Sequence, residues 1–256
     1  MLIRWLAFLI LTTAIGGAST EKAMEHWQKR DQRPELEKAL ELFEAAIKFN
    51  PSDREAITLF VRGSFLLANA HLKEKSEKKK ILQKARNLGD QTLKIDTSDL
   101  SRSLERLTKA DVPLIYWTMS NLGYLSEVNG ILSSIGNKRQ ITEMLQRVSK
   151  LDPEYFYGAV PRFWGAYYAV VPRIAGGNMK KSRKEFEKAI QLGPDFLTNK
   201  TLMAELFWTR DGDRKEFERM LNEVLKAEVN NPEIAPENNL EKIRAQELLK
   251  AADDLF

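Results

Sequence analysis

Residues 39–51 read Ala-Leu-Glu-Leu-Phe-Glu-Ala-Ala-Ile-Lys-Phe-Asn-Pro, and residues 182–194 read Ser-Arg-Lys-Glu-Phe-Glu-Lys-Ala-Ile-Gln-Leu-Gly-Pro. In both stretches a small residue, a phenylalanine, an alanine and a proline stand at positions i, i+4, i+7 and i+12. At about 100° per residue the first three fall on one face of a helix, and the proline ends that helix. Each stretch therefore predicts an amphipathic helix with a narrow buried stripe, followed by a turn.

A small-large-small stripe closed by proline is typical of the second helix of a tetratricopeptide (TPR) unit. Weaker copies of the spacing begin at Ala85, Ile141 and Phe217. We therefore expect five second helices, which begin near residues 36, 80, 139, 180 and 214. Further helices are expected at Arg54–Leu72, Val112–Val128, Pro161–Val171 and, after a loop containing Pro232 and Pro236, at Asn239–Ala252.

The fold expected from these patterns is all-α, because no alternating strand pattern is longer than chance. The intervals between successive copies are uneven, whereas regular TPR units repeat at about 34 residues. We predict an irregular TPR-like solenoid of helical hairpins, an α-α superhelix, with insertions in its middle. Such a stack offers a concave surface to a partner, so a binding module is favoured over an enzyme.

The N-terminus resembles a targeting segment. Arg4 precedes the apolar run Trp5–Ile15, and the small residues Gly16-Gly17-Ala18 suit cleavage after Ala18. We predict a signal peptide over residues 1–18 and a single domain over residues 19–256 that is periplasmic or secreted. The alternative is an uncleaved N-terminal membrane anchor, although the run is short for a bilayer span.

Composition excludes several kinds of chemistry. The 256 residues contain no cysteine, which rules out disulfides, thiol catalysis and a lipid-modified N-terminal cysteine. The two histidines have no partner at helical spacing, and no metal-binding or nucleotide-binding motif is present. Because the net charge is only +4 and the charges are mixed along the chain, nucleic acid is not an expected partner. We expect no catalytic residues, no metal and no cofactor.

Residues 155–168 hold an unusual concentration of aromatic side chains. The first interpretation is core packing between helices. The second is an apolar cavity with a few polar groups, which suits an amphipathic organic ligand, such as one that carries a carboxylate. In that case we expect Arg162 to meet an anion, because a buried guanidinium is costly without one. The candidate ligand-binding residues are Trp117, Asn121, Tyr157, Arg162, Trp164 and Tyr168.

The turn after this aromatic helix is about five residues longer than a standard TPR unit requires. It contains Pro172, Gly176 and Gly177, which we interpret as structural residues, since glycine permits a positive φ. The stretch superficially resembles a phosphate-binding loop but lacks the spacing of one.

Several segments, taken together and in order, resemble the T-component proteins of tripartite ATP-independent periplasmic (TRAP) transporters. The segments cover nearly all of the mature chain: Tyr116–Gly123, Leu151–Gly158, Pro161–Tyr168, Pro172, Gly176-Gly177, Lys181–Ala189, Asp213–Leu225, Pro236–Lys242 and Ala251–Phe256. Any one of these pieces alone indicates only weak TPR similarity.

The resemblance implies a periplasmic, all-helical protein without catalytic residues. Its implied partner is the extracytoplasmic substrate-binding protein of a TRAP transporter. The resemblance also implies a channel for a hydrophobic small molecule and a homo-oligomer, with a trimer as the familiar case. Members of the family can be lipid-anchored through an N-terminal cysteine, which this chain lacks. The alternative function is a generic periplasmic TPR scaffold for envelope assembly without a small ligand.

Overall fold

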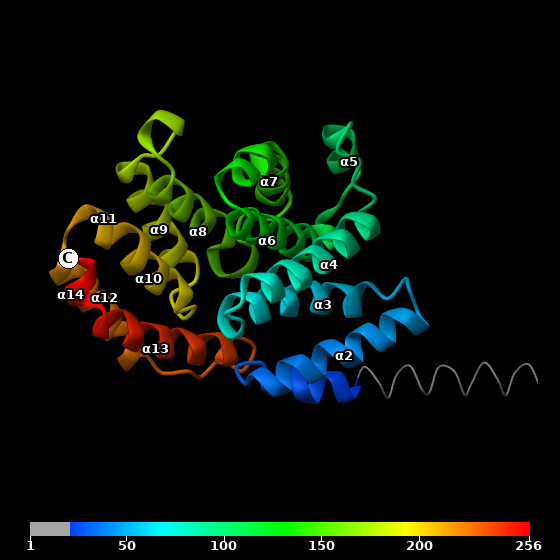
Figure 1. The fold of residues 1–256 in the computed structure, drawn as a ribbon, viewed down its shortest axis with the longest axis horizontal. Coiled ribbons are helices and arrows are strands. Elements are labelled where there is room, and N and C mark those ends of the chain that lie inside the picture. Colours follow the sequence, from blue (N-terminus) through cyan, green and yellow to red (C-terminus); the bar gives the residue numbers. More distant parts are fainter. Residues whose placement is uncertain (1–20) are drawn as a thin grey trace, which may run out of the picture. The chain divides into compact units, whose positions relative to one another are not determined.

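The structure is a computed structural model that describes residues 21–256, apart from the side chains of Ile131 and Ala175. The expected signal peptide over residues 1–18 lies outside the described residues. Contacts divide the chain into two compact units, one ending at Leu151 and the other running from Asp152 to Phe256. Every regular element of the described residues is a helix, which confirms the all-α expectation (Figure 1).

The first unit begins with a short helix over residues 21–27. The elements that follow are α2 (Arg33–Phe49), α3 (Arg54–Leu66), the π-helix η1 (Leu67–His71), α4 (Lys75–Leu93), α5 (Leu100–Glu105), the 3-10 turn η2 (Lys109–Asp111), α6 (Val112–Asn129) and α7 (Ile131–Leu151). Helix α3 packs against α2, α4 and α6, and α6 also packs against α4 and α7.

Local chemistry explains where several of these helices begin. The Asp53 carboxylate accepts a hydrogen bond from the Ala56 N–H at 3.0 Å, which caps α3. Asp111 directly precedes α6 but does not cap that helix in the same way. Its carboxylate instead accepts from the backbone N–H and the hydroxyl of Thr108, in a capping box one turn earlier.

Helices α2 and α4 begin within five residues of their expected starts, whereas α7 differs. The spacing predicts its start near residue 139. The chain breaks only at Gly130, whose φ of +102° ends α6, and α7 then runs through Gly136. A glycine inside a helix weakens it by about 1 kcal/mol but does not by itself end it.

The second unit also consists of helices joined by turns. Its elements are α8 (Tyr155–Val170), the 3-10 turn η3 (Arg173–Ala175), α9 (Met179–Leu192), α10 (Thr198–Leu202), the π-helix η4 (Met203–Trp208), α11 (Thr209–Asp211), α12 (Arg214–Lys226), α13 (Ala235–Lys250) and α14 (Ala252–Leu255). The last long helix begins earlier than expected. Pro236 lies in its first turn, where the missing N–H of a proline costs nothing, rather than in the preceding loop.

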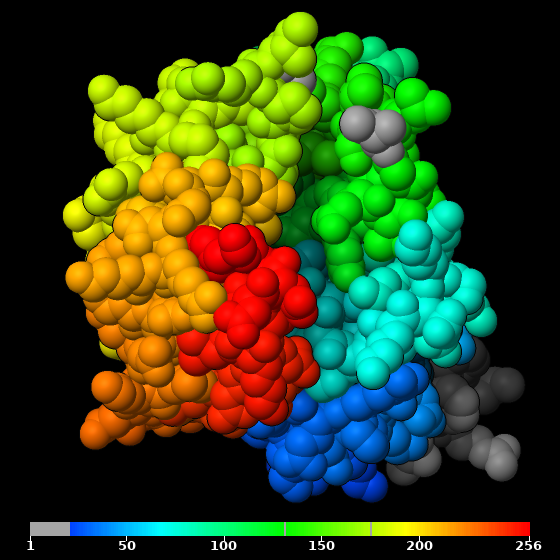
Figure 2. Space-filling model, turned by 60° about the vertical axis from the view of Figure 1, so that its left-hand side comes forward, coloured from blue at the N-terminus to red at the C-terminus, as the bar shows by residue number. Residues whose placement is uncertain are grey.

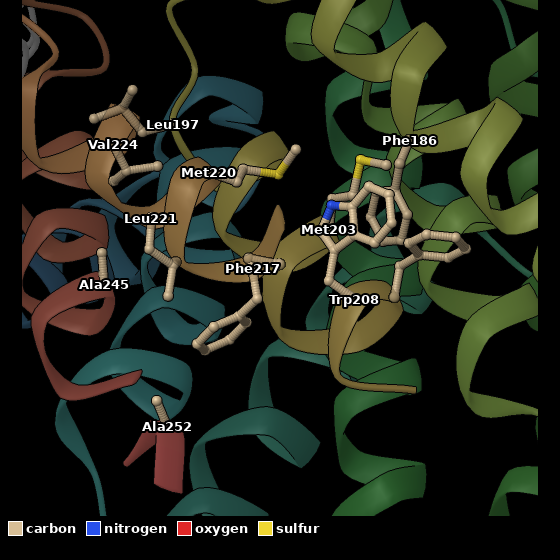
Figure 3. Close-up of a cluster of buried hydrophobic side chains, with 12 residues drawn as sticks. Phe186, Leu197, Met203, Trp208, Phe217, Met220, Leu221, Val224, Ala245 and Ala252 are labelled. Atoms are coloured by element: carbon tan, nitrogen blue, oxygen red, sulfur yellow. The ribbon is translucent and has the colours of Figure 1, made fainter. Parts of the chain in front are cut away.

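The core of the second unit forms around α9, η4 and α12. Phe186, Met203 and Trp208 lie close together, and Phe217 and Leu221 of α12 extend the cluster toward Ala245 and Ala252 (Figure 3). Phe186, Phe217 and Leu221, which the spacing predicts on a buried helix face, are thus confirmed as buried. Within residues 21–256, no helix combines the length and apolar character that crossing a bilayer requires.

Candidate functional site

The aromatic segment begins with a strained turn. Phe156, Tyr157 and Gly158 have φ values of +46°, +56° and +78°, so three successive residues adopt the left-handed conformation. For residues other than glycine this costs roughly 1–2 kcal/mol each, and it is rare for bulky side chains. The expected helix from Pro161 therefore has a left-handed turn in front of it, which the sequence does not predict.

Backbone contact with the end of α9 holds the left-handed turn in place. A Cβ atom on Gly158 would lie 2.8 Å from the carbonyl oxygen of Ala189. A Cβ atom on Gly193 would lie 2.6 Å from the Cβ and the carbonyl oxygen of Tyr157. Glycine at both positions thus lets two backbones approach more closely than any other residue would allow.

Asn199 joins the two backbones through hydrogen bonds. Its buried amide group lies 3.1 Å from the carbonyl oxygen of Tyr157, and 2.9 Å from those of Ala189 and Gly193. Buried carbonyl groups without donors are costly, so this one side chain stabilises both the turn and the end of α9. Asn199 was absent from the expected site. An asparagine in a helical turn is unfavourable on propensity alone, which is the signal that could have identified it.

Arg162 is 5% exposed and completes this network. Its guanidinium donates to the Oδ1 of Asn199 at 2.9 Å and to the carbonyl oxygen of Tyr157 at 3.2 Å. It also lies 4.8 Å from the centre of the Phe196 ring, within range of a cation–π interaction. The side chain expected to meet an anionic ligand therefore contacts oxygen atoms of the protein itself.

The Tyr157 side chain points away from this buried network. Its ring stacks on that of Phe196, with centroids 5.5 Å apart. Its hydroxyl lies 3.1 Å from the Glu233 carboxylate and 3.2 Å from the Asn231 amide nitrogen, in the segment before α13. The turn thus presents an aromatic ring with a polar tip beside an acidic side chain.

The helical part of α8 carries a second group of rings. Trp164 and Tyr168 stack with centroids 5.7 Å apart, and Tyr167 meets Trp164 edge-on at 5.5 Å. These rings are half-buried, whereas Gly165 between them is buried against the Phe186 ring. One side of α8 therefore packs on α9, and the stripe Trp164–Tyr168 keeps part of its aromatic surface accessible.

Trp117 and Asn121 belong to α6 of the first unit, and both are buried. The Asn121 amide donates to the carbonyl oxygens of Trp117, at 2.8 Å, and of Val61, at 2.9 Å. The Asn121 Oδ1 atom is buried and has no hydrogen-bond partner among the described residues. The Trp117 ring contacts the rings of Phe65 and Tyr116.

The six predicted residues thus fall into three groups. Trp117 and Asn121 contact each other in the first unit, Tyr157 and Arg162 in the left-handed turn, and Trp164 and Tyr168 on α8. Sequence spacing predicts the first and third groups, since residues four apart on a helix are neighbours. It does not predict the left-handed turn or its contact with α9.

The turn after α8 places its two glycines in demanding positions. Gly176 has a φ of +106°, and a Cβ atom on Gly177 would lie 1.7 Å from the carbonyl oxygen of Val171. The Gly177 N–H donates to the carbonyl oxygen of Pro172 at 3.0 Å, and the Asn178 N–H donates to that of Tyr168 at 2.9 Å. This turn is therefore tightly hydrogen-bonded.

One carboxylate of the second unit stands out electrostatically. Glu241 on α13 is buried, and burial raises the pKa of its carboxyl group, which the nearby Arg244 only partly offsets. Its Oε1 accepts from the Thr198 hydroxyl at 3.2 Å, while its Oε2 has no partner among the described residues. Among residues 21–256, no group of three or more histidine, aspartate and glutamate side chains could hold a metal ion.

Two comparisons place the chain among known proteins. A family model described as TRAP transporter T-component matches residues 68–256. An uncharacterized protein of Treponema pallidum (strain Nichols) is 29% identical over 160 residues, which cover 59% of this chain and 46% of that protein. The match thus spans about half the length of that relative. Because the family model covers most of the chain, including α8 and the turns on either side of it, the protein belongs to the TRAP transporter T-component family.

Proposed function

We propose that this protein is a non-enzymatic, extracytoplasmic accessory component of a TRAP-type solute uptake system that docks the substrate-binding protein of that system. The family match over residues 68–256 is the observation that carries this proposal. A TPR-like solenoid and a homo-oligomer, such as a trimer, belong to the same proposal. The apolar run before residue 19 supports export through a signal peptide.

The experiment is affinity capture from the native envelope fraction with this protein as bait. Recovery of an extracytoplasmic solute-binding protein supports the proposal. Recovery of envelope-assembly machinery alone would favour the scaffold function and contradict transport. A second capture uses Tyr157→Phe as bait for comparison with the wild type. This variant lacks only the hydroxyl that lies beside Asn231 and Glu233.

A ligand-relay role rests on the accessible aromatic stripe of α8. Stacked half-buried rings suit the apolar body of an organic acid, because they provide a large contact area at a low cost in side-chain entropy. We propose that Trp164 and Tyr168 contact such a ligand. Arg162 acts in this proposal by positioning the left-handed turn, since its guanidinium hydrogen-bonds to protein oxygens.

Tryptophan fluorescence during titration with fatty acids tests the ligand. Trp164→Ala is expected to weaken binding at least about tenfold, with little loss of stability, since the ring is only half-buried. The control is Trp208→Phe, which alters a ring buried in the core of the second unit. The relay role would be contradicted if the dissociation constant for the fatty acid were unchanged in Trp164→Ala, or if the wild type gave no saturable signal.

A further inference from the structure

The turn between α8 and α9, together with the start of α9, forms a basic tip that we define as Val170–Lys184. It carries five cationic side chains and no acidic one. All five are exposed: Arg173, Lys180, Lys181, Arg183 and Lys184. In Figure 1 the yellow-green turn of this tip projects beyond the ends of α8 and α9, and Figure 2 shows the yellow-green segment on the visible face of the molecule.

An apolar side chain stands at the end of the basic tip. Ile174 is 100% exposed, and Val170 beside it is 47% exposed. Of the exposed large apolar side chains of the described residues, Ile174 is the most exposed. Moving an isoleucine side chain out of water is favourable by roughly 1.5–3 kcal/mol. The turn that carries Ile174 is closed by the backbone hydrogen bonds of Gly176 and Gly177, which hold the side chain outward.

The charges of the basic tip are arranged unfavourably for the isolated protein. Cations in the first turn of a helix oppose the helix dipole, and α9 has no acidic residue there. Arg183 pairs with Glu187 at 2.9 Å, whereas Arg173, Lys180 and Lys184 have no ion-pair partner among the described residues. An anionic surface would relieve this repulsion.

Two of the lysines share a direction. By helix geometry, Lys180 and Lys184 lie about 40° apart around α9. The buried residues Ser182, Phe186 and Ala189 occupy the opposite side of the helix. The exposed lysines can therefore approach a charged surface while the packed face of α9 remains on the core.

We propose that the basic tip binds the surface of an anionic phospholipid bilayer. Ile174 inserts between the headgroups, and the surrounding cations lie against the lipid phosphates. A projecting isoleucine suits a deformable bilayer, whereas a protein partner would need a matching hollow ringed by acidic groups. The proposal concerns a different surface from the accessible stripe of α8, and it holds or fails independently of transport.

Vesicle co-sedimentation of the full chain tests this proposal. The vesicles contain phosphatidylcholine alone or phosphatidylcholine mixed with phosphatidylglycerol. Wild-type protein is expected to partition onto the anionic vesicles, and Lys180→Glu with Lys184→Glu is expected to lower that partitioning at least about tenfold. Ile174→Ser is expected to lower it about fivefold. Acidic residues at these positions of α9 suit the helix dipole, so loss of folding does not explain the effect.

Two matched controls isolate the tip from general charge and apolarity. Lys79→Glu with Lys80→Glu makes the same change in charge on α4, where both lysines are exposed and Glu77 lies among the lysines. Leu132→Ser removes another exposed apolar side chain, which is 83% accessible. Both controls are expected to bind anionic vesicles within about twofold of wild type. Every variant keeps residues 1–18, so the contribution of these residues is common to all variants, and the tip is judged by the preference for anionic vesicles and by the differences between variants.

Three outcomes would overturn the proposal. The first is equal wild-type binding to neutral and anionic vesicles, and the second is control variants that lose as much binding as the tip variants. The third is vesicle binding unchanged in the lysine variant while its capture of an acidic protein falls, which would assign the tip to a protein partner. Loss of the anionic preference at high salt in the wild type alone would support the ionic contribution.

Discussion

The two copies of the same spacing, residues 39–51 and 182–194, form helices with the same buried face, but the two faces meet different partners. In both, the three stripe residues are buried: Ala39, Phe43 and Ala46 in α2, and Ser182, Phe186 and Ala189 in α9. Phe43 meets the edge of the Trp27 ring at 5.9 Å, whereas Phe186 lies against the bare backbone of Gly165. The stripe phenylalanine thus meets a side chain in α2 and a backbone in α9.

Their C-terminal ends differ further. The first copy ends at the exposed Asn50, whose side chain accepts a local hydrogen bond from the Ser52 N–H at 3.1 Å. The second ends at Gly193, which abuts the left-handed turn and whose carbonyl oxygen accepts a hydrogen bond from Asn199. Identical spacing thus specifies the helix and its buried face, but not the partner that meets it.

The largest expected effect tests the buried stripe that α2 and α9 have in common. Phe43→Ala and Phe186→Ala are each expected to lower the free energy of unfolding by about 3–5 kcal/mol, because each removes a fully buried ring. Urea denaturation followed by circular dichroism measures the loss. Phe49→Ala, at a half-exposed ring of α2, is the control and should cost under about 1 kcal/mol. A similar cost for all three would refute the shared stripe.

The next effect separates the two helix ends. Asn199→Ala is expected to cost about 2–4 kcal/mol, because the buried Arg162 loses its amide-oxygen acceptor and the carbonyl oxygens of Tyr157, Ala189 and Gly193 lose the two N–H donors that they share. Asn50→Ala removes an exposed local hydrogen bond and should cost about 0.5 kcal/mol. The same denaturation measurement applies. Equal costs would mean that the left-handed turn is held by packing alone.

A third prediction tests the backbone contact of α9. Gly165→Ala places a Cβ atom 2.7 Å from the Phe186 ring, and we expect a loss of about 1–3 kcal/mol in the free energy of unfolding. Gly63→Ala meets the flexible end of Leu40 at 2.8 Å and the Trp27 ring at 3.0 Å. The gain in helix propensity offsets part of this crowding, so we expect a smaller loss, of under about 1 kcal/mol. In the background of Phe186→Ala, Gly165→Ala should become harmless, as a double-mutant cycle would reveal.

The smallest effect concerns pH, and its sign is opposite in the two units. Hydrogen bonding to Lys84 lowers the pKa of Glu44 on α2, so its contribution to stability is present above its ordinary pKa of 4.5 and is lost as pH falls through the lowered value. Burial raises the pKa of Glu241, so stability falls as pH rises from 4.5 through the raised value.

Glu241→Gln should therefore raise stability near neutral pH relative to wild type and leave it little changed at pH 4. Glu44→Gln should lower stability near neutral pH by under about 1 kcal/mol, because the ion pair is partly solvated. Denaturation midpoints measured across this range check both signs. A Glu241→Gln variant that is destabilised at neutral pH would mean that the buried carboxylate is charged and paired.

Much of the fold follows from the sequence. The starts of α2, α4, α9 and α12 and the buried stripes agree with the spacing, because burial of one helix face depends on residues within three turns of each other. The predicted start of α7 near residue 139 was wrong, because this helix begins at Ile131 and continues through Gly136. Of the candidate site, the stacking of Trp164 on Tyr168 was predictable as a pair four residues apart.

The sequence by itself determined the all-α class, the buried faces and the absence of cysteine chemistry, because these depend on local spacing and composition. Only the tertiary structure decided the left-handed turn at Phe156 and Tyr157. That conformation is unfavourable locally, and it persists because Asn199 and Gly193, some forty residues away, supply the hydrogen bonds and the space it requires. Likewise, only the folded chain sets the exposed Ile174 among exposed cations, since exposure depends on what the neighbouring helices leave uncovered.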